Sequence, residues 1–516
     1  MNTKHSTKHI FNPDSIMVNT SDGDTLPLLQ SQKSITRQGV VRMFVATVVA
    51  ALGPVSFGYG LGFASPATAD LSNANKGPRN ALSKESIAWF GSLINIGAIV
   101  GSLLGGQCAE RLGRKASIIL SCLPFTLGWL LIVLPSSFSQ QDQKDESHIL
   151  APLCIGRTLS GIGLGMASVA VPIYIAEVST VSYRGFLGTL NQVAVTVGVL
   201  VAYLLGVWIK PYYWLAVVAM CIVASLAVSM LFIPETPRWL LVDGQQKKAI
   251  AALTWLRGDC ANIANEFSEI EGSLQEQETL SCSEFRRPTL YKPLFICVML
   301  MFFQQFSGIN SVMFFASVIT NTTHPSHSLK IYEPTMIGAV QFVITIIAGL
   351  VMDKFGRRVL LITSGSLMSI SAIGIGVYFK INSALNDPDT IPAHYHISVP
   401  WLSLLCLMVY ITGFSLGLGA IPWLIMSEIL PTRARGTAGG IAASVTWSSS
   451  FIVTYLFHHF TDTMRYYGTF WFYGGVSLLA VCFVVAVVPE TKGKSLEEIE
   501  RYFDSKQRNS FSHKRQ

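Results

Sequence analysis

Twelve apolar stretches, each long enough to cross a lipid bilayer, constrain this chain of 516 residues more than any other feature. One helical crossing needs about 20 apolar residues. Charged residues make up only 13% of the chain, against about 25% in a typical soluble domain. The pattern predicts an all-α membrane protein with spans at about 41–63, 86–108, 116–135, 149–175, 186–207, 212–233, 293–319, 335–352, 358–380, 399–427, 437–457 and 469–488.

The distribution of basic residues predicts how these spans are oriented. An even number of spans places both termini on one side of the membrane. Most of the 37 lysines and arginines fall in the tails and loops on that side, which the positive-inside rule identifies as cytoplasmic. The net charge of +7 therefore reflects topology and contact with anionic membrane lipids, and we expect no nucleic-acid partner.

Other protein classes are disfavoured by what the chain lacks. The nine cysteines form no CxxC pair, so we expect neither a disulfide framework nor a zinc site. Residues 1–40 lack the apolar core of a cleavable signal peptide. The sequence contains no Ser/His/Asp set, metal-ligand spacing or phosphate-binding loop, so we expect neither an enzyme nor a cofactor.

Three charged motifs occur twice, in the same order and at a nearly constant offset, which indicates a duplicated six-helix unit. The copies are ERLGRK (110–115) and DKFGRR (353–358), Glu177 to Arg184 and Glu428 to Arg435, and PETPR (234–238) and PETKG (489–493). The expected organisation is a cytoplasmic tail (1–40), a first bundle (41–233), an intracellular linker with short helices (234–292), a second bundle (293–488) and a second cytoplasmic tail (489–516).

The duplicated motifs place acidic and basic side chains at the cytoplasmic ends of helices. Exposed ion pairs contribute only about 0–1 kcal/mol each, whereas a network shielded from water biases a two-state equilibrium more strongly. We therefore expect a latch that holds the inside closed, with simple topology anchors as the alternative. Its members are Arg114, Glu177, Arg184, Arg357, Glu428 and Arg435.

The polar stretch QQFSGIN (304–310) lies inside an apolar run. A polar group buried there without a partner costs about 1–3 kcal/mol. Neutral carboxamides carry both donors and acceptors, which suits a hydroxyl-rich ligand. On an unbroken helix Gln305 and Asn310 would lie about 140° apart, so we expect Gly308 to break the helix and bring them together. Such breaks are typical of transporter substrate sites; contacts between packed helices are the alternative role for these amides.

Together with the run that starts at Gly156-Arg157, the PIYIAE segment (172–177) and Ile421-Pro-Trp423, these motifs resemble the sugar porter family of the major facilitator superfamily. The resemblance covers about 40–500. It is greatest to the class III facilitative glucose transporters, on FGYGL (57–61), Ser65-Pro66, a short first outside loop and a longer loop at 381–398. It implies the twelve-helix major facilitator fold, with two six-helix bundles that expose a central site alternately to each side.

The resemblance also implies a sugar site between the two halves. Carboxamides would bond sugar hydroxyls, and Trp423 would pack on the apolar face of the ring. Many relatives carry a glutamate at the position of Ser415 and an asparagine at that of Thr446, so the identity of the sugar stays open. The implied site residues are Gln192, Gln304, Gln305, Asn310, Gln341 and Trp423.

The mode of transport follows from one missing acid. Symporters of the family tend to carry an aspartate where this chain has Gly60, and the first span contains no acidic residue. We therefore expect facilitated diffusion of a hexose, and glucose is the hexose that we favour as the substrate. Arg157 is either structural or part of a gate. A disaccharide (trehalose-like) carrier, a proton-coupled carrier and a non-transporting sugar sensor remain alternatives, the last disfavoured by the short tail after Pro489.

Two short motifs concern location and modification. DTLPLL (24–29) fits an acidic dileucine signal formed by Asp24, Leu28 and Leu29, which a clathrin adaptor would read. We therefore expect the protein in endosomal–lysosomal membranes, the plasma membrane or both. Asn321-Thr-Thr323 is a glycosylation sequon on an outside loop.

Overall fold

The computed structural model describes residues 36–71, 82–137, 146–180, 182–258, 263–275, 288–314, 333–385, 400–431, 435–494 and 502–503. Within these residues the chain is helical apart from turns and short irregular links. The dileucine motif, Asn321 and the side chain of Arg435 lie outside this set, so the sorting and glycosylation expectations stay predictions.

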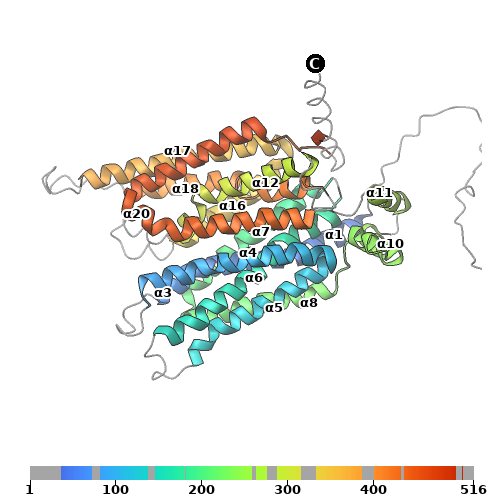
Figure 1. Cartoon of the computed structure of the whole chain (residues 1–516), viewed down its shortest axis with the longest axis horizontal. Coiled ribbons are helices and arrows are strands. Elements are labelled where there is room, and N and C mark those ends of the chain that lie inside the picture. Colours follow the sequence, from blue (N-terminus) through green and yellow to red (C-terminus); the bar gives the residue numbers. More distant parts are fainter. Residues whose placement is uncertain are drawn as a thin grey trace, which may run out of the picture. The chain divides into compact units, whose positions relative to one another are not determined.

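The helices follow one another along the chain and run roughly side by side (Figure 1). Their bounds are α1 (Arg37–Ala50), α2 (Leu52–Gly62), α3 (Ala64–Leu71), α4 (Lys84–Arg111), α5 (Arg114–Val133), the 3-10 turn η2 (Leu134–Ser137), α6 (Glu146–Val178), α7 (Arg184–Trp208), α8 (Tyr212–Leu231), α9 (Pro237–Val242), α10 (Gln246–Arg257), α11 (Ile263–Gln275), α12 (Pro288–Phe306), α13 (Ile309–Phe314), α16 (Glu333–Phe355), α17 (Arg357–Leu385), α18 (Pro400–Leu416), α19 (Ile421–Ile429) and α20 (Arg435–Val487).

Among the described residues, twelve helical stretches are long and apolar enough to cross a membrane, which confirms the predicted number. The first span combines α1 to α3, the seventh combines α12 and α13, and the tenth combines α18 and α19. The last span starts at His459 rather than near 469. It lies within α20, which has a sharp break at Arg465, where φ is 58°. The side on which the termini lie stays a prediction.

Two large hydrophobic cores correspond to the two halves of the chain. One is built from α1 to α8 with a residue of α10, and the other from α12 to α20. Trp423 packs against both cores, and Trp447 of α20 lies in the core of the first half. The outer faces expose leucines and isoleucines such as Leu123, Leu350 and Ile370, as expected for helices solvated by lipid. The two halves therefore meet around a pair of tryptophans.

Glycines allow α4 and α6 to pack closely. A Cβ atom on Gly97 would lie 2.0 Å from the carbonyl oxygen of Thr158, and one on Gly161 would lie 2.2 Å from that of Ile94. Small residues at such positions let two helix backbones approach closely inside a membrane. The glycine run that follows Arg157 thus packs α6 tightly against α4.

At one end of the helices, the first copy of the duplicated motifs forms a compact cluster. Gly113 has φ of 103°, a conformation that glycine adopts without strain. The Glu235 carboxylate accepts the backbone N–H groups of Arg114 at 3.2 Å and Lys115 at 2.9 Å, and so caps the start of α5. The Arg114 guanidinium pairs with Glu177 at 2.8 Å.

The second copy repeats this geometry. Gly356 has φ of 87°. Glu490 accepts the backbone N–H groups of Arg357 and Arg358, both at 3.0 Å, at the start of α17. Arg357 pairs with Glu428 at 3.1 Å. The sequence repeat is therefore a structural repeat, and we call the end formed by these two clusters the charged end.

The two clusters differ in electrostatic detail. Burial raises the pKa of the Glu235 carboxyl above its ordinary value, against the effect of its hydrogen bonds and of Arg114. Burial acts in the same direction on Glu490, but three backbone N–H donors together outweigh it and lower the pKa of that carboxyl. Thr491 also donates to Glu428 at 2.8 Å. Of the two capping carboxyls, Glu490 is thus the better satisfied when it is ionised.

Contacts between the halves run along α4 and α20. At the charged end, Glu110 accepts the backbone N–H of Thr437 at 2.7 Å and its hydroxyl at 2.8 Å, at the N-terminus of α20. Further along, Ser102 and Ser444 share a hydrogen bond of 2.9 Å. The ion pairs of the two clusters close within each half, so this carboxylate, rather than those pairs, joins one half to the other here.

The linker helices α10 and α11 lie at one end of the span helices (Figure 1). Both helices lie within residues 234–292, where the sequence predicts a linker with short helices. Arg257 is buried, pairs with Glu266 at 2.8 Å and donates to the Val178 carbonyl oxygen at 2.8 Å. This arginine fastens the linker to the end of α6.

We predict that replacing Gly97 by alanine destabilises the protein by about 1–3 kcal/mol, because the new methyl group overpacks the backbone of α6. The matched control is Gly91→Ala in the same helix, where a Cβ atom would meet nothing within 4 Å. Thermal unfolding in detergent, followed by tryptophan fluorescence, measures both. Equal melting temperatures for the two variants would show that this seam is not tightly packed.

Candidate functional site

The helix break predicted at Gly308 is confirmed. α12 ends at Phe306, Gly308 has φ of 94°, and α13 begins at Ile309. A Cβ atom on Gly308 would lie 2.3 Å from the ring of Tyr473, so no other residue fits there without displacement. The Tyr410 hydroxyl donates to the Ser307 carbonyl oxygen at 2.6 Å and satisfies an acceptor near the break. The break is therefore built into the packing.

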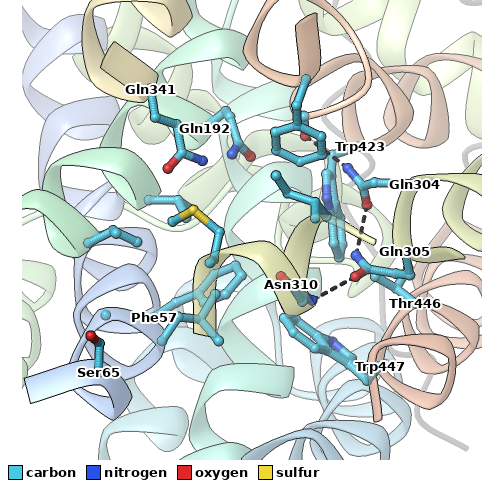
Figure 2. Close-up of a pocket in the computed structure, with 18 of the residues that line it drawn as sticks. Phe57, Ser65, Gln192, Gln304, Gln305, Asn310, Gln341, Trp423, Thr446 and Trp447 are labelled. Atoms are coloured by element: carbon cyan, nitrogen blue, oxygen red, sulfur yellow. Dashed lines mark hydrogen bonds between the residues drawn. The ribbon is translucent and has the colours of Figure 1, made fainter. Parts of the chain in front are cut away.

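A chain of hydrogen bonds joins the three amides of this segment (Figure 2). The Asn310 amide donates to the Gln305 side-chain oxygen at 2.6 Å, and the Gln305 amide donates to Gln304 at 3.2 Å. The Gln304 amide then donates to the Leu418 and Gly419 carbonyl oxygens at 2.6 and 3.0 Å. Those carbonyls belong to the second break, between α18 and α19. The amides do form helix–helix contacts, but they also border a cavity.

The cavity encloses about 720 Å³ between the two halves, counting the part that is open to solvent. All six residues that the sequence analysis assigned to a site line it: Gln192, Gln304, Gln305, Asn310, Gln341 and Trp423. Gln341 is buried, and its side-chain oxygen has no protein partner within the described residues. No charged residue belongs to the described lining. The arrangement offers neutral donors and acceptors beside aromatic surface.

Several lining residues were not assigned from the sequence. Phe57 and Trp447 meet edge to face with ring centroids 5.3 Å apart, and Trp423 lies 6.4 Å from Trp447. Thr446 and Tyr203 also line the cavity, whereas Ser415 does not. Trp447 is a large aromatic residue among small residues in its span, and this contrast is the signal in the sequence that could have identified it as a site residue.

A relay of neutral groups connects this site to the seam between the halves. The Asn310 amide donates to the Ser450 hydroxyl at 2.6 Å, and that hydroxyl donates to the side-chain oxygen of Asn95 at 3.0 Å. Asn95 lies on α4 of the first half, whereas Ser450 lies on α20 of the second. A ligand that displaces the Asn310 amide therefore disturbs a contact between the halves.

Arg157 is fully buried and does not line the cavity. Its guanidinium donates to the backbone oxygens of Phe90 at 3.2 Å and Gly60 at 2.9 Å, and its carbon lies 5.1 Å from the centroid of the Phe90 ring. Cation–π contact and carbonyl acceptors stabilise the charge in place of a carboxylate. In the described part of the first span, the one acidic residue is Asp70, which accepts the Tyr212 N–H near the end of that span.

The described side chains that were assigned to a latch lie at the charged end. Arg114 pairs with Glu177, and Arg357 pairs with Glu428. Arg184 interacts electrostatically with Glu428 of the other half. Glu110, which the sequence analysis did not assign to the latch, makes the direct bond between halves at this end.

Comparison with known proteins identifies the family. The family model described as "Sugar (and other) transporter" matches residues 46–503. The mouse (Mus musculus) facilitated glucose transporter member 8 of solute carrier family 2 is 36% identical over 493 residues, which is 94% of this chain and 98% of that protein. The honeybee (Apis mellifera ligustica) facilitated trehalose transporter Tret1 is 34% identical, over 89% of this chain and 88% of its own.

Among solved structures, the proton:xylose symporter XylE with bound 6-bromo-6-deoxy-D-glucose matches with a TM-score of 0.77 and 27% identity. The match covers 90% of this chain and 99% of that one. Since the fold, the family model and relatives above 30% identity agree, this chain belongs to the sugar transporter family of the major facilitator superfamily, as a multi-pass membrane protein of the transporter class and not an enzyme.

Proposed function

We propose that this protein is a facilitative hexose transporter, a uniporter with glucose as its preferred substrate, which works by alternating access. The observation that carries the proposal is a cavity between the halves lined by neutral carboxamides and two tryptophans. Amides match sugar hydroxyls, and indole faces cover the apolar side of a pyranose ring. The glucose transporter of mouse, which aligns with nearly the whole chain, supports a hexose.

In the proposed site, Gln305, Asn310, Gln192 and Gln341 bond the sugar hydroxyls. Gln304 holds the second helix break through its bonds to the Leu418 and Gly419 carbonyls, so its oxygen faces Gln305 in a fixed orientation. Trp423, which packs against both cores, covers the ring. A trehalose carrier is the second candidate, on the strength of the honeybee relative.

We predict that Gln305→Leu lowers glucose transport, expressed as the maximal rate divided by the half-saturation concentration, by at least about fivefold. The reason is that a buried polar group left without its partner costs about 1–3 kcal/mol, and 1.4 kcal/mol is tenfold. Uptake of radiolabelled glucose and trehalose into proteoliposomes measures it. Ser415→Ala, a buried hydroxyl outside the cavity, is the control and should transport normally. Undiminished uptake by Gln305→Leu would refute the site.

Transport without proton coupling is supported by the surroundings of Arg157. Its guanidinium bonds the Gly60 carbonyl, where a symporter would have a carboxylate, and no acidic side chain belongs to the described lining of the cavity. A proton carrier needs a group that titrates within the transport path.

We therefore predict that an inward proton gradient changes the initial rate of glucose uptake by less than about twofold and never drives the sugar above its equilibrium concentration. Proteoliposomes with and without the gradient, and with a protonophore, give the measurement, and liposomes without protein give the background. Accumulation above equilibrium that the protonophore abolishes would establish symport instead.

We further propose that the charged end faces the cytoplasm and works as the latch. Each cluster keeps the helix ends of its own half together, while Glu110 at the N-terminus of α20 joins the halves. Arg114, Glu177, Arg184, Arg357, Glu428 and Arg435 are its proposed members. Opening this end then requires the Glu110–Thr437 bonds to break.

We predict that Glu110→Gln favours the state that is open at the charged end. The reporter is a cysteine introduced by Ser427→Cys, which is buried in the closed structure, after the nine native cysteines are replaced. Its reaction with a hydrophilic maleimide should become several-fold faster. Glu85→Gln, an exposed carboxylate in the first turn of the same helix, is the control. Equal labelling rates in the two variants would exclude Glu110 from the latch.

A further inference from the structure

A second cavity lies between the halves, on the charged-end side of the first. It comprises about 380 Å³, counting the part that is open to solvent, and is bordered by α6, α7 and α19. Gln192 and Trp423 line both cavities, so one amide and one indole form the partition between them. Its lining also includes Ala176 and Ser427, the sequence neighbours of the paired carboxylates Glu177 and Glu428. A solute that leaves the first cavity toward the charged end therefore meets this one next.

The second cavity is lined by polar side chains that still have hydrogen-bonding capacity within the described residues. Asn191 is only 9% exposed, and its side-chain oxygen has no hydrogen-bond partner within the described residues. A buried acceptor without a partner is costly and calls for a donor from a ligand or water. Ser427 donates to the Leu424 carbonyl oxygen at 2.7 Å, which leaves its oxygen free to accept.

The charged groups around the cavity are largely paired with one another. Arg184 lines it, and this guanidinium interacts with Glu428 across the halves. Glu177, beside the cavity, pairs with Arg114 at 2.8 Å. Glu428 also pairs with Arg357 at 3.1 Å, so both glutamates already have an arginine partner and Arg184 adds a hydrogen-bond donor to the lining.

We propose that this cavity is a second monosaccharide subsite, in which the transported sugar pauses between the main site and the solution at the charged end. The Asn191 side-chain oxygen accepts a hydrogen bond from a sugar hydroxyl. The Gln192 amide borders both cavities, so it can bond the sugar in either one. The indole of Trp423 likewise covers the sugar ring in either cavity. The inference rests on the proposed function, because it takes the same sugar as the main cavity.

The subsite has a kinetic signature. A sugar that pauses there lowers the half-saturation concentration for transport that starts at the charged end, and it lowers the maximal rate by the same factor. Removing the pause raises both and leaves their quotient unchanged. Transport that starts at the opposite end depends on the main site and keeps its parameters. Damage to the fold or to the main site would instead lower the quotient in both directions.

The test uses full-length protein in vesicles of known sidedness, with radiolabelled glucose added on one side at a time. For Asn191→Leu we expect the half-saturation concentration and the maximal rate from the charged end to rise together by about two- to fivefold, the value of one neutral hydrogen bond. Asn191→Gln keeps the carbonyl oxygen and should behave like the wild type.

The outcomes separate the two proposals. If wild-type vesicles do not transport glucose, the proposed function fails. If they do and Asn191→Leu leaves both sides unchanged, or lowers the quotient on both sides, the subsite is refuted while the uniporter stands. If Asn191→Leu impairs trehalose but not glucose, the cavity takes the second ring of a disaccharide, which also overturns the pausing role.

Discussion

Hydrocarbon offers no hydrogen-bond partners, so the helix breaks in the seventh and tenth spans need partners from the protein itself. The Gln304 amide bonds the Leu418 and Gly419 carbonyls that the break between α18 and α19 sets free. The Tyr410 hydroxyl in turn bonds the Ser307 carbonyl beside the other break. The helix beside each break therefore satisfies a carbonyl at the other, and the polar cavity between the halves lies beside both.

The same bonds connect the cavity to the motion that transport requires. From Gln304 the chain of amides runs through Gln305 and Asn310 to Ser450, and from there to Asn95 in the other half. A sugar that recruits the Asn310 amide has to compete with the Ser450 hydroxyl. Binding and the contact between the halves thus share one set of donors and acceptors, which gives the substrate a physical means of favouring rearrangement of the seam.

The two copies of the duplicated motifs have the same geometry, but the pKa values of their capping carboxyls shift in opposite directions. Each half uses a left-handed glycine, a carboxylate that caps the next helix and a buried arginine–glutamate pair. Yet burial leaves Glu235 with a raised pKa, while N–H donors leave Glu490 with a lowered one. Thr491 also bonds Glu428. The carboxylate that caps α17 is therefore held more firmly in its ionised form than the one that caps α5.

Local properties of the chain carried most of the prediction. Hydrophobic length gave the number of spans, and repeated motifs gave the two equivalent clusters, because each depends on residues close together in the sequence. The neutral amides and Gly308 indicated the broken helix, and the packing around Tyr473 bears this out. The family resemblance added Gln192, Gln341 and Trp423 from distant helices, and all three line the cavity.

Relations between helices far apart in the chain needed the tertiary structure. The amino-acid sequence did not show that the ion pairs close within each half, because a charge at a helix end has several neighbours in reach. It did not single out Glu110 as the bridge, Trp447 as a wall of the cavity, or the unpartnered oxygen of Asn191. Composition and periodicity determined what this protein is made of, whereas the distances between packed helices decided which side chains meet, since hydrogen bonds act only over about 3 Å.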